Sequence, residues 1–123
     1  MQHHFFLIFI KNGCKIAIAS SNSRKLIQAV LESQGIASYF EAIVTSCDVK
    51  AGKPAPDVYL EAAKLLNLNP CDCVVFEDIP AGIMAGKAAG MTVFAVEDEF
   101  SEPLREKKLA LADGWVRDYT ELI

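Results

Sequence analysis

Three short groups of polar residues, each placed after a run of apolar residues, have the chemistry needed to bind a phosphate group. The first group, residues 20–23, reads Ser-Ser-Asn-Ser and precedes a helical pattern. Hydroxyl groups and the free backbone N–H groups at a helix N-terminus can together hold a phosphate. A simpler role is also open, because Asn22 or Ser23 could cap the helix. We expect both phosphate contacts and a helix cap in this group.

The second group is the segment Ala-Gly-Lys-Pro-Ala-Pro-Asp at residues 51–57. Its two prolines restrict the backbone just ahead of a helical pattern. A lysine fixed there, Lys53, is a compact positive charge that could neutralise a phosphoryl oxygen. The alternative is an ordinary solvated lysine on the surface.

The third group is the acidic pair Glu77 and Asp78, which directly follows the apolar residues 73–76. Two carboxylates at the end of a strand offer the hard oxygen ligands that Mg²⁺ prefers. The alternative is that Asp78 only caps the following helix.

The elements that must position these groups alternate between short apolar strands and helices. The apolar runs predict strands at residues 15–19, 42–45, 73–77, 92–96 and 114–116, and the periodic segments predict helices at 24–34, 57–66 and 80–89. This alternation is typical of an α/β fold with a parallel sheet covered by helices. Ligands bind such sheets at the carboxyl ends of the strands. We therefore expect Ser20, Lys53 and Asp78 to line one cleft.

Two glycines in the last predicted helix point to tight packing. Gly82 and Gly86 lie four residues apart, on one side of a helix that begins at Pro80. Because a glycine has no side chain, we expect this helix to lie close to the sheet.

Composition excludes several classes of protein. The chain has 123 residues, the length of one domain, and its 52% hydrophobic content argues against global disorder. A net charge of −4 without a basic cluster argues against a nucleic-acid partner. Four cysteines are too few for a disulfide scaffold, and no apolar stretch is long enough to span a membrane. We expect one domain over residues 1–123 in a cytoplasmic protein.

The N-terminal run Phe-Phe-Leu-Ile-Phe-Ile at residues 5–10 has two interpretations. Asn12 and Gly13 follow it, and this pair favours the tight turn of a β-hairpin. The same pair also ends helices. The sequence therefore leaves a strand and a helix open here.

The segments IAIASSNS, VKAGKPAPDVY and CVVFEDIPAGIMAGKAAGM occur in this order. Together they resemble the haloacid dehalogenase-like hydrolases, and within them the phosphatases and phosphomutases similar to β-phosphoglucomutase. The resemblance extends from about residue 12 to residue 123. It implies a Rossmann-like core of three layers with a mostly parallel sheet.

The resemblance also implies roles for the polar groups. Ser20 and the backbone at Ser21 would bind the phosphoryl group of a small phosphorylated metabolite, and Lys53 would neutralise its charge. Glu77 and Asp78 would hold the cofactor, Mg²⁺. The family transfers the phosphoryl group to an aspartate at the end of a first strand, upstream of the serine motif.

This chain departs from the family pattern at that aspartate. Residues 1–19 contain no Asp and no Glu, so neither the nucleophile nor the second acid two residues later has a match. The family's small cap domain has no match either. We therefore expect a C-terminal core portion that lacks the nucleophile strand and is inactive alone. The alternatives are a non-catalytic phosphate-binding or interaction module, or half of a split enzyme whose sheet a second chain completes.

Overall fold

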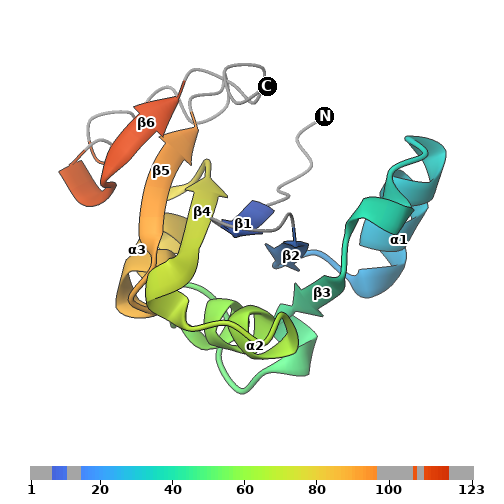
Figure 1. The fold of residues 1–123 in the computed structure, drawn as a ribbon, viewed down its shortest axis with the longest axis horizontal. Helices are drawn as coiled ribbons and strands as arrows, with labels where there is room; N and C mark the ends of the chain where they lie inside the picture. Colours follow the sequence, from blue (N-terminus) through green and yellow to red (C-terminus); the bar gives the residue numbers. More distant parts are fainter. Residues whose placement is uncertain (1–6, 11–14, 97–106, 108–109, 117–123) are drawn as a thin grey trace.

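The fold is a six-stranded sheet with helices on both faces (Figure 1). The computed structural model describes residues 7–10, 15–96, 107 and 110–116. The strands are β1 (Leu7–Ile10), β2 (Ile16–Ser20), β3 (Ala42–Thr45), β4 (Cys73–Glu77), β5 (Thr92–Val96) and β6 (Gly114–Val116). The helices are α1 (Arg24–Ser33), α2 (Asp57–Leu65) and α3 (Pro80–Ala88), with short 3₁₀ helices η1 (Ala37–Tyr39), η2 (Ser46–Asp48) and η3 (Pro70–Asp72).

The predicted strands and helices are confirmed with small shifts at their ends. The strand predicted at 15–19 lies at Ile16–Ser20, because Ser20 still pairs with Thr45 in the parallel register of β2 and β3. The helix ends agree to within one residue. Gly35 and Gly90, with φ of 69° and 85°, follow the ends of α1 and α3, where glycine accepts a positive φ without strain.

The order of the strands is β3-β2-β1-β4-β5-β6. β2 and β3 are parallel, as are β4, β5 and β6, whereas β1 is antiparallel to both of its neighbours, β2 and β4. Leu7 lies opposite Ile18 on one side and Phe76 on the other. The strand interpretation is therefore confirmed for Leu7–Ile10, and the helix interpretation is wrong there. Phe5, Phe6, Asn12 and Gly13 lie outside the described residues.

The position of β1 has a clear physical reason. Without it, β2 and β4 would each present a row of unpaired backbone N–H and C=O groups inside the sheet. The antiparallel strand pairs with both rows at once. A segment of this chain therefore occupies the position between β2 and β4.

Most of the core lies between the sheet and the pair α2 and α3. The larger buried cluster joins these two helices to strands β2 to β5, whereas α1 covers the opposite face with the smaller cluster of Ile18, Ile27 and Leu31. α3 approaches the sheet closely, as predicted. A Cβ atom at Gly86 would lie 2.6 Å from Cγ2 of Val93, which is too short for two carbon atoms. Within the described residues, no helix has the length and apolar character needed to cross a membrane.

Candidate functional site

Within the described part of the chain, four buried polar residues lie at the carboxyl ends of strands. They are Ser20 at the end of β2, Thr45 at the end of β3, and Glu77 and Asp78 at the end of β4. Burial of polar groups is unfavourable unless they are hydrogen-bonded. Their concentration at one edge of the sheet marks it as the place to look for chemistry.

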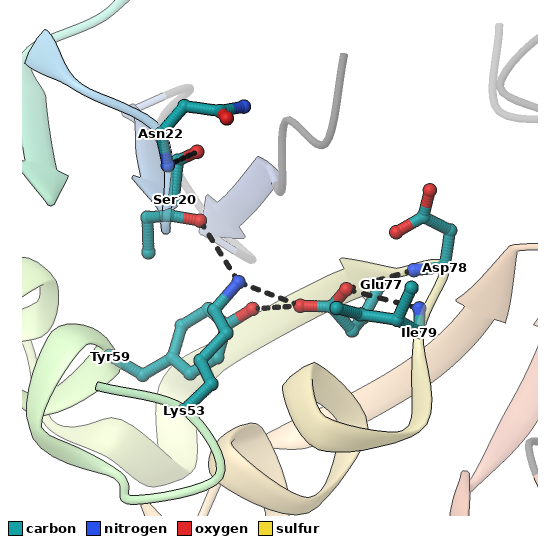
Figure 2. A network of polar contacts seen from close by, with 8 residues as sticks. Ser20, Asn22, Lys53, Tyr59, Glu77, Asp78 and Ile79 are labelled. Atoms are coloured by element: carbon teal, nitrogen blue, oxygen red, sulfur yellow. Dashed lines mark hydrogen bonds and ion pairs between the residues drawn. The ribbon is translucent and has the colours of Figure 1, made fainter. Parts of the chain in front are cut away.

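Lys53 connects the ends of β2 and β4. Its Nζ donates to the Ala19 carbonyl oxygen at 3.2 Å and to Oε2 of Glu77 at 2.9 Å (Figure 2). β1 separates these two strands in the sheet, so the lysine reaches across the position of β1. The side chains of Lys53 and Glu77 are only 2% and 0% exposed. The interpretation of Lys53 as a solvated surface lysine is therefore wrong.

The loop before α2 presents Lys53. The backbone N–H of Ala55 donates to the Gly52 carbonyl oxygen at 3.0 Å, which closes a turn around the lysine. Asp57, the first residue of α2, accepts a hydrogen bond from the backbone N–H of Ala51 at 3.3 Å. Asp57 therefore starts its helix and ties the loop to it.

The carboxylate of Glu77 is surrounded by hydrogen-bond donors. Oε2 accepts from Lys53 and, at 2.6 Å, from the hydroxyl of Tyr59. Oε1 accepts from the backbone N–H groups of Asp78 at 3.0 Å and of Ile79 at 3.3 Å. Burial raises the pKa of Glu77 to about 7, although the positive charge of Lys53 and the hydrogen bond from Tyr59 act in the opposite direction. Burial also lowers the pKa of Lys53.

Asp78 lies beside this network, and its carboxylate lies apart from the contacts that join Lys53 to Glu77 (Figure 2). Its side chain is buried, with 6% of the residue exposed. The cap of α3 is Ile79, without a side-chain hydrogen bond, so the interpretation of Asp78 as a helix cap is wrong. The structure thus turns the two adjacent acids in different directions.

The metal-binding role of this pair stays a prediction. No group of three His, Cys, Asp or Glu side chains close enough to hold a metal ion occurs in the described parts of the chain. Mg²⁺ is often bound by one or two carboxylates, with phosphate oxygens and water as the other ligands. Asp78 fits that limited requirement, whereas the oxygens of Glu77 are already used by Lys53, Tyr59 and the backbone.

The serine-rich segment combines a helix cap with a tight turn. Oγ of Ser23 accepts a hydrogen bond from the backbone N–H of Leu26 at 3.2 Å, which confirms the predicted cap of α1. Oγ of Ser20 accepts from the backbone N–H of Asn22 at 3.0 Å. Ser20 is buried and Ser21 is exposed. The phosphate-binding roles of Ser20, Ser21 and Lys53 stay predictions.

Tyr59 and Gly82 also belong to the site. Tyr59 was not identified from the sequence, and close packing was predicted at Gly82 without its contact with Glu77. Tyr59 is fully buried, and Nζ of Lys53 lies 5.1 Å from the centre of its ring. A Cβ atom at Gly82 would overlap the carboxylate of Glu77, so the glycine makes room for this buried acid. A tyrosine on the buried face of a helix is a usable signal, because its hydroxyl needs a partner.

The end of β3 has a structural role instead. Oδ2 of Asp48 accepts from the backbone N–H of Thr45 at 2.8 Å and from the guanidinium of Arg24 at 2.7 Å. The hydrogen bond from the Thr45 backbone is the main cause that lowers the pKa of Asp48. These contacts cap η2 and connect it to α1.

An open hollow of about 570 Å³ lies away from the predicted residues, between η2 and α2. It is lined by Cys47, Asp48, Val49, Lys50, Asp57, Leu60, Glu61 and Lys64. None of Ser20, Lys53 and Asp78 lines it, so their shared cleft stays a prediction.

With the fold and the site described, the chain can be compared with known proteins. The family model of the haloacid dehalogenase-like hydrolases matches residues 4–90. This chain belongs to the haloacid dehalogenase-like hydrolases. The family and the Rossmann-like α/β fold predicted from the motifs are thereby confirmed.

Individual relatives agree with this family. The chain is 44% identical to hexitol phosphatase A of Escherichia coli over 102 residues, which cover 82% of this chain and 47% of the relative. It is 48% identical to the bifunctional riboflavin kinase/FMN phosphatase of Arabidopsis thaliana over 86 residues, which cover 69% of this chain and 23% of the relative. A β-phosphoglucomutase structure from Clostridium difficile aligns with a TM-score of 0.71 and 31% identity, over 85% of this chain and 44% of the other. The chain therefore spans less than half the length of each of these proteins.

Proposed function

We propose that this chain carries the phosphate-binding and Mg²⁺-binding residues of a phosphatase or phosphomutase that acts on a small phosphorylated metabolite. The observation that supports this most directly is the position of Lys53. It places one buried ammonium group between the serine-rich end of β2 and the acidic end of β4. Two relatives named as phosphatases, hexitol phosphatase A and the FMN phosphatase, point to the same chemistry.

Within this proposal, the serine segment binds the phosphoryl group. The hydroxyl of Ser20 and the backbone N–H of Ser21 are hydrogen-bond donors at the N-terminal side of α1, where the helix dipole favours an anion. Lys53 neutralises part of the phosphoryl charge from the other side of the site. Together they orient the group that is transferred.

Asp78 is the proposed ligand of Mg²⁺. When bound, the ion would polarise a phosphoryl oxygen and offset negative charge as it develops. Buried beside an anionic substrate, Asp78 would otherwise add repulsion. A divalent cation at this position changes the local charge in favour of phosphate.

The proposed reaction needs a carboxylate nucleophile. A carboxylate oxygen attacks phosphorus and a new O–P bond forms. The bond from phosphorus to the leaving oxygen breaks, and a general acid donates the proton that turns this oxygen into an alcohol. Water then releases phosphate in a phosphatase, or a second substrate hydroxyl accepts the phosphoryl group in a mutase. Since residues 1–19 contain no Asp or Glu, we propose that this carboxylate comes from another part of the active enzyme. A second chain is one source.

A second candidate function is a phosphate-binding module without catalysis. The observation that favours it is the placement of β1, which fills the centre of the sheet between β2 and β4 with a segment that has no acidic residue. The binding residues could then be retained without turnover.

Calorimetric titration with inorganic phosphate in the presence of MgCl₂ tests the binding that both candidates share. Replacing Ser20 by Ala should weaken phosphate binding about tenfold, because a hydrogen bond to a charged group is lost. Ser33→Ala is the matched control, since Ser33 is exposed and donates only to the Val30 carbonyl oxygen in α1. Absence of phosphate binding, or equal effects of the two substitutions, would contradict the proposal.

Turnover of p-nitrophenyl phosphate separates the two candidates. The purified chain with MgCl₂ should show no turnover, because its nucleophile is missing. Addition of the chain or segment that supplies the carboxylate should restore it in an enzyme and not in a binding module. Turnover by the chain alone that disappears in Asp78→Ala would overturn the need for an outside carboxylate, whereas turnover that survives this substitution would come from a contaminating enzyme.

A further inference from the structure

We propose that Tyr59 and Glu77 are positioning residues that fix the ammonium group of Lys53, and that Glu77 does not bind the metal. This assignment rests on the proposed function, because it divides the roles within the same site. It differs from the expectation that Glu77 and Asp78 hold Mg²⁺ together. Three features of the structure carry it.

The first feature is the number of hydrogen bonds to Glu77. A carboxylate has about four lone-pair positions on its two oxygens. Four donors already face them: Lys53 and Tyr59 at Oε2, and the backbone N–H groups of Asp78 and Ile79 at Oε1. A metal ion at Glu77 would have to displace one of these donors in a buried environment, where an unpaired polar group is costly.

The second feature is the packing that holds Glu77 in place. The residue is 0% exposed, and the first turn of α3 approaches it so closely that only a glycine fits at position 82. The backbone N–H groups of Asp78 and Ile79, which directly precede α3, donate to Oε1. Rotation of the carboxylate toward Asp78 would break this whole arrangement (Figure 2).

The third feature is the double contact of Tyr59. Its hydroxyl donates to Oε2 of Glu77 at 2.6 Å, and the centre of its ring lies 5.1 Å from Nζ of Lys53. One buried side chain therefore contacts both members of the ion pair. A lysine ammonium is otherwise a flexible point charge on a long stem. Tyr59, Glu77 and the Ala19 carbonyl oxygen restrict it to one position at the edge of the sheet.

NMR detection of lysine side-chain ammonium groups tests the positioning role directly. In the wild-type chain, Lys53 should give a protected signal with slow proton exchange, because its side chain is 2% exposed. Tyr59→Phe keeps the ring and removes the hydroxyl. We expect proton exchange at Lys53 to become about tenfold faster and phosphate binding to weaken several-fold, as lost orientation of a charged group implies. Tyr39→Phe is the matched control, because Tyr39 is 65% exposed.

Mg²⁺ titrations test the second half of the proposal. Asp78→Asn should lower Mg²⁺ affinity about 100-fold or abolish binding, whereas Glu77→Gln should change it less than about threefold. Equal losses in the two variants would show that Glu77 is a ligand. In the wild-type chain, saturation with Mg²⁺ should leave the Lys53 signal protected. Release of that signal by Mg²⁺ would overturn the proposal even if Glu77→Gln does not fold.

The two proposals can fail separately. A wild-type chain that binds neither Mg²⁺ nor phosphate would contradict the proposed function. The ammonium signal of Lys53 would still decide whether Tyr59 and Glu77 fix the lysine. An unchanged signal in Tyr59→Phe would refute the positioning role while phosphate binding stands.

Discussion

Two ion pairs of similar length show how differently the two ends of this molecule use charge. Lys53 and Glu77 are 2.9 Å apart with side chains 2% and 0% exposed, whereas Lys87 and Asp113 are 2.7 Å apart with side chains 42% and 36% exposed. Each pair joins residues far apart in the sequence. The shorter distance belongs to the exposed pair, so the distance alone does not indicate how much each pair contributes to stability.

Burial is what separates them. The exposed pair stays in contact with water, which screens the charges and solvates either residue if the other is removed. The buried pair gave up its hydration when the chain folded, and each charge now depends on the other. The exposed pair fastens α3 to the segment before β6, and the buried pair holds the predicted site together.

Removing each lysine in turn tests the difference between the two ion pairs and should give the largest effect. Lys53→Met should lower the free energy of unfolding by about 3–5 kcal/mol, because it leaves a buried carboxylate without its cation. Lys87→Met should lower it by less than about 1 kcal/mol. Urea unfolding at pH 8 measures both.

The double variant Lys53→Met with Glu77→Gln tests whether the unpaired charge causes the loss. Removing both charges should recover part of the stability that Lys53→Met loses, since the unpaired charge is gone. Equal effects of Lys53→Met and Lys87→Met would refute the distinction between the pairs.

Gly82→Ala should have the next largest effect. The added Cβ would overlap the carboxylate of Glu77, and overpacking of this kind costs about 3 kcal/mol when buried groups cannot move. Gly52→Ala is the matched control, because its Cβ would meet Cβ of Ser46 at an ordinary 3.4 Å. Thermal unfolding of the two variants gives the difference. A tolerated alanine at position 82 would show that Glu77 can move.

The sequence predicted the framework of this site well. Apolar runs bounded by turn residues marked strands β3 to β6, and the rule for parallel sheets placed Ser20, Glu77 and Asp78 at one edge. The sequence did not decide between a strand and a helix for residues 5–10, which include β1. This run is apolar on every side and shows neither a period of two nor a period of 3.6.

The direction of the side chains could not be predicted from local pattern. Tyr59 and Glu77 lie 18 residues apart, and their contact depends on how α2 packs beside β4. Neighbouring acids such as Glu77 and Asp78 look equivalent as metal ligands in the sequence. Only the packed structure shows that Glu77 faces Lys53. Close packing at Gly82 was predicted. That the group packed against it is the buried carboxylate of Glu77 was not predicted.

The next prediction concerns how the stability of the variant Lys53→Met changes with pH, and its expected size is intermediate. Burial raises the pKa of Glu77 to about 7 from 4.5, so the stabilisation linked to its proton is complete below pH 4.5 and is lost as pH rises through 7. The positive charge of Lys53 opposes this shift. Without it, the loss should continue above pH 7.

We therefore expect the variant Lys53→Met to lose about 1 kcal/mol more stability than the wild-type chain between pH 5 and pH 8. Urea unfolding across this range measures the difference. Parallel curves for the two proteins would mean that Lys53 does not control the ionisation of Glu77.

The smallest expected effect concerns the exposed pair of Lys87 and Asp113. Its contribution to stability should depend on pH in the opposite direction to that of Glu77, because the pKa of Asp113 is lowered. The hydrogen bond from Lys87 is the main cause that lowers the pKa of Asp113, and the backbone N–H of Val93 adds to it. A lowered pKa stabilises the fold above the ordinary value of 3.8, and this contribution is lost as pH falls through the lowered pKa. Asp113→Asn should therefore cost less than about 1 kcal/mol at pH 7, as expected for an exposed pair. Because acid removes the same charge from the wild-type chain, the two proteins should converge in stability as the pH falls below 3.8, the ordinary pKa of Asp113.

High salt at pH 7 should also reduce the difference in stability between Asp113→Asn and the wild-type chain, whereas it should have little effect on the buried pair of Lys53 and Glu77. A salt dependence of equal size at both pairs would show that water reaches Lys53, and the contrast between the two pairs would then be wrong.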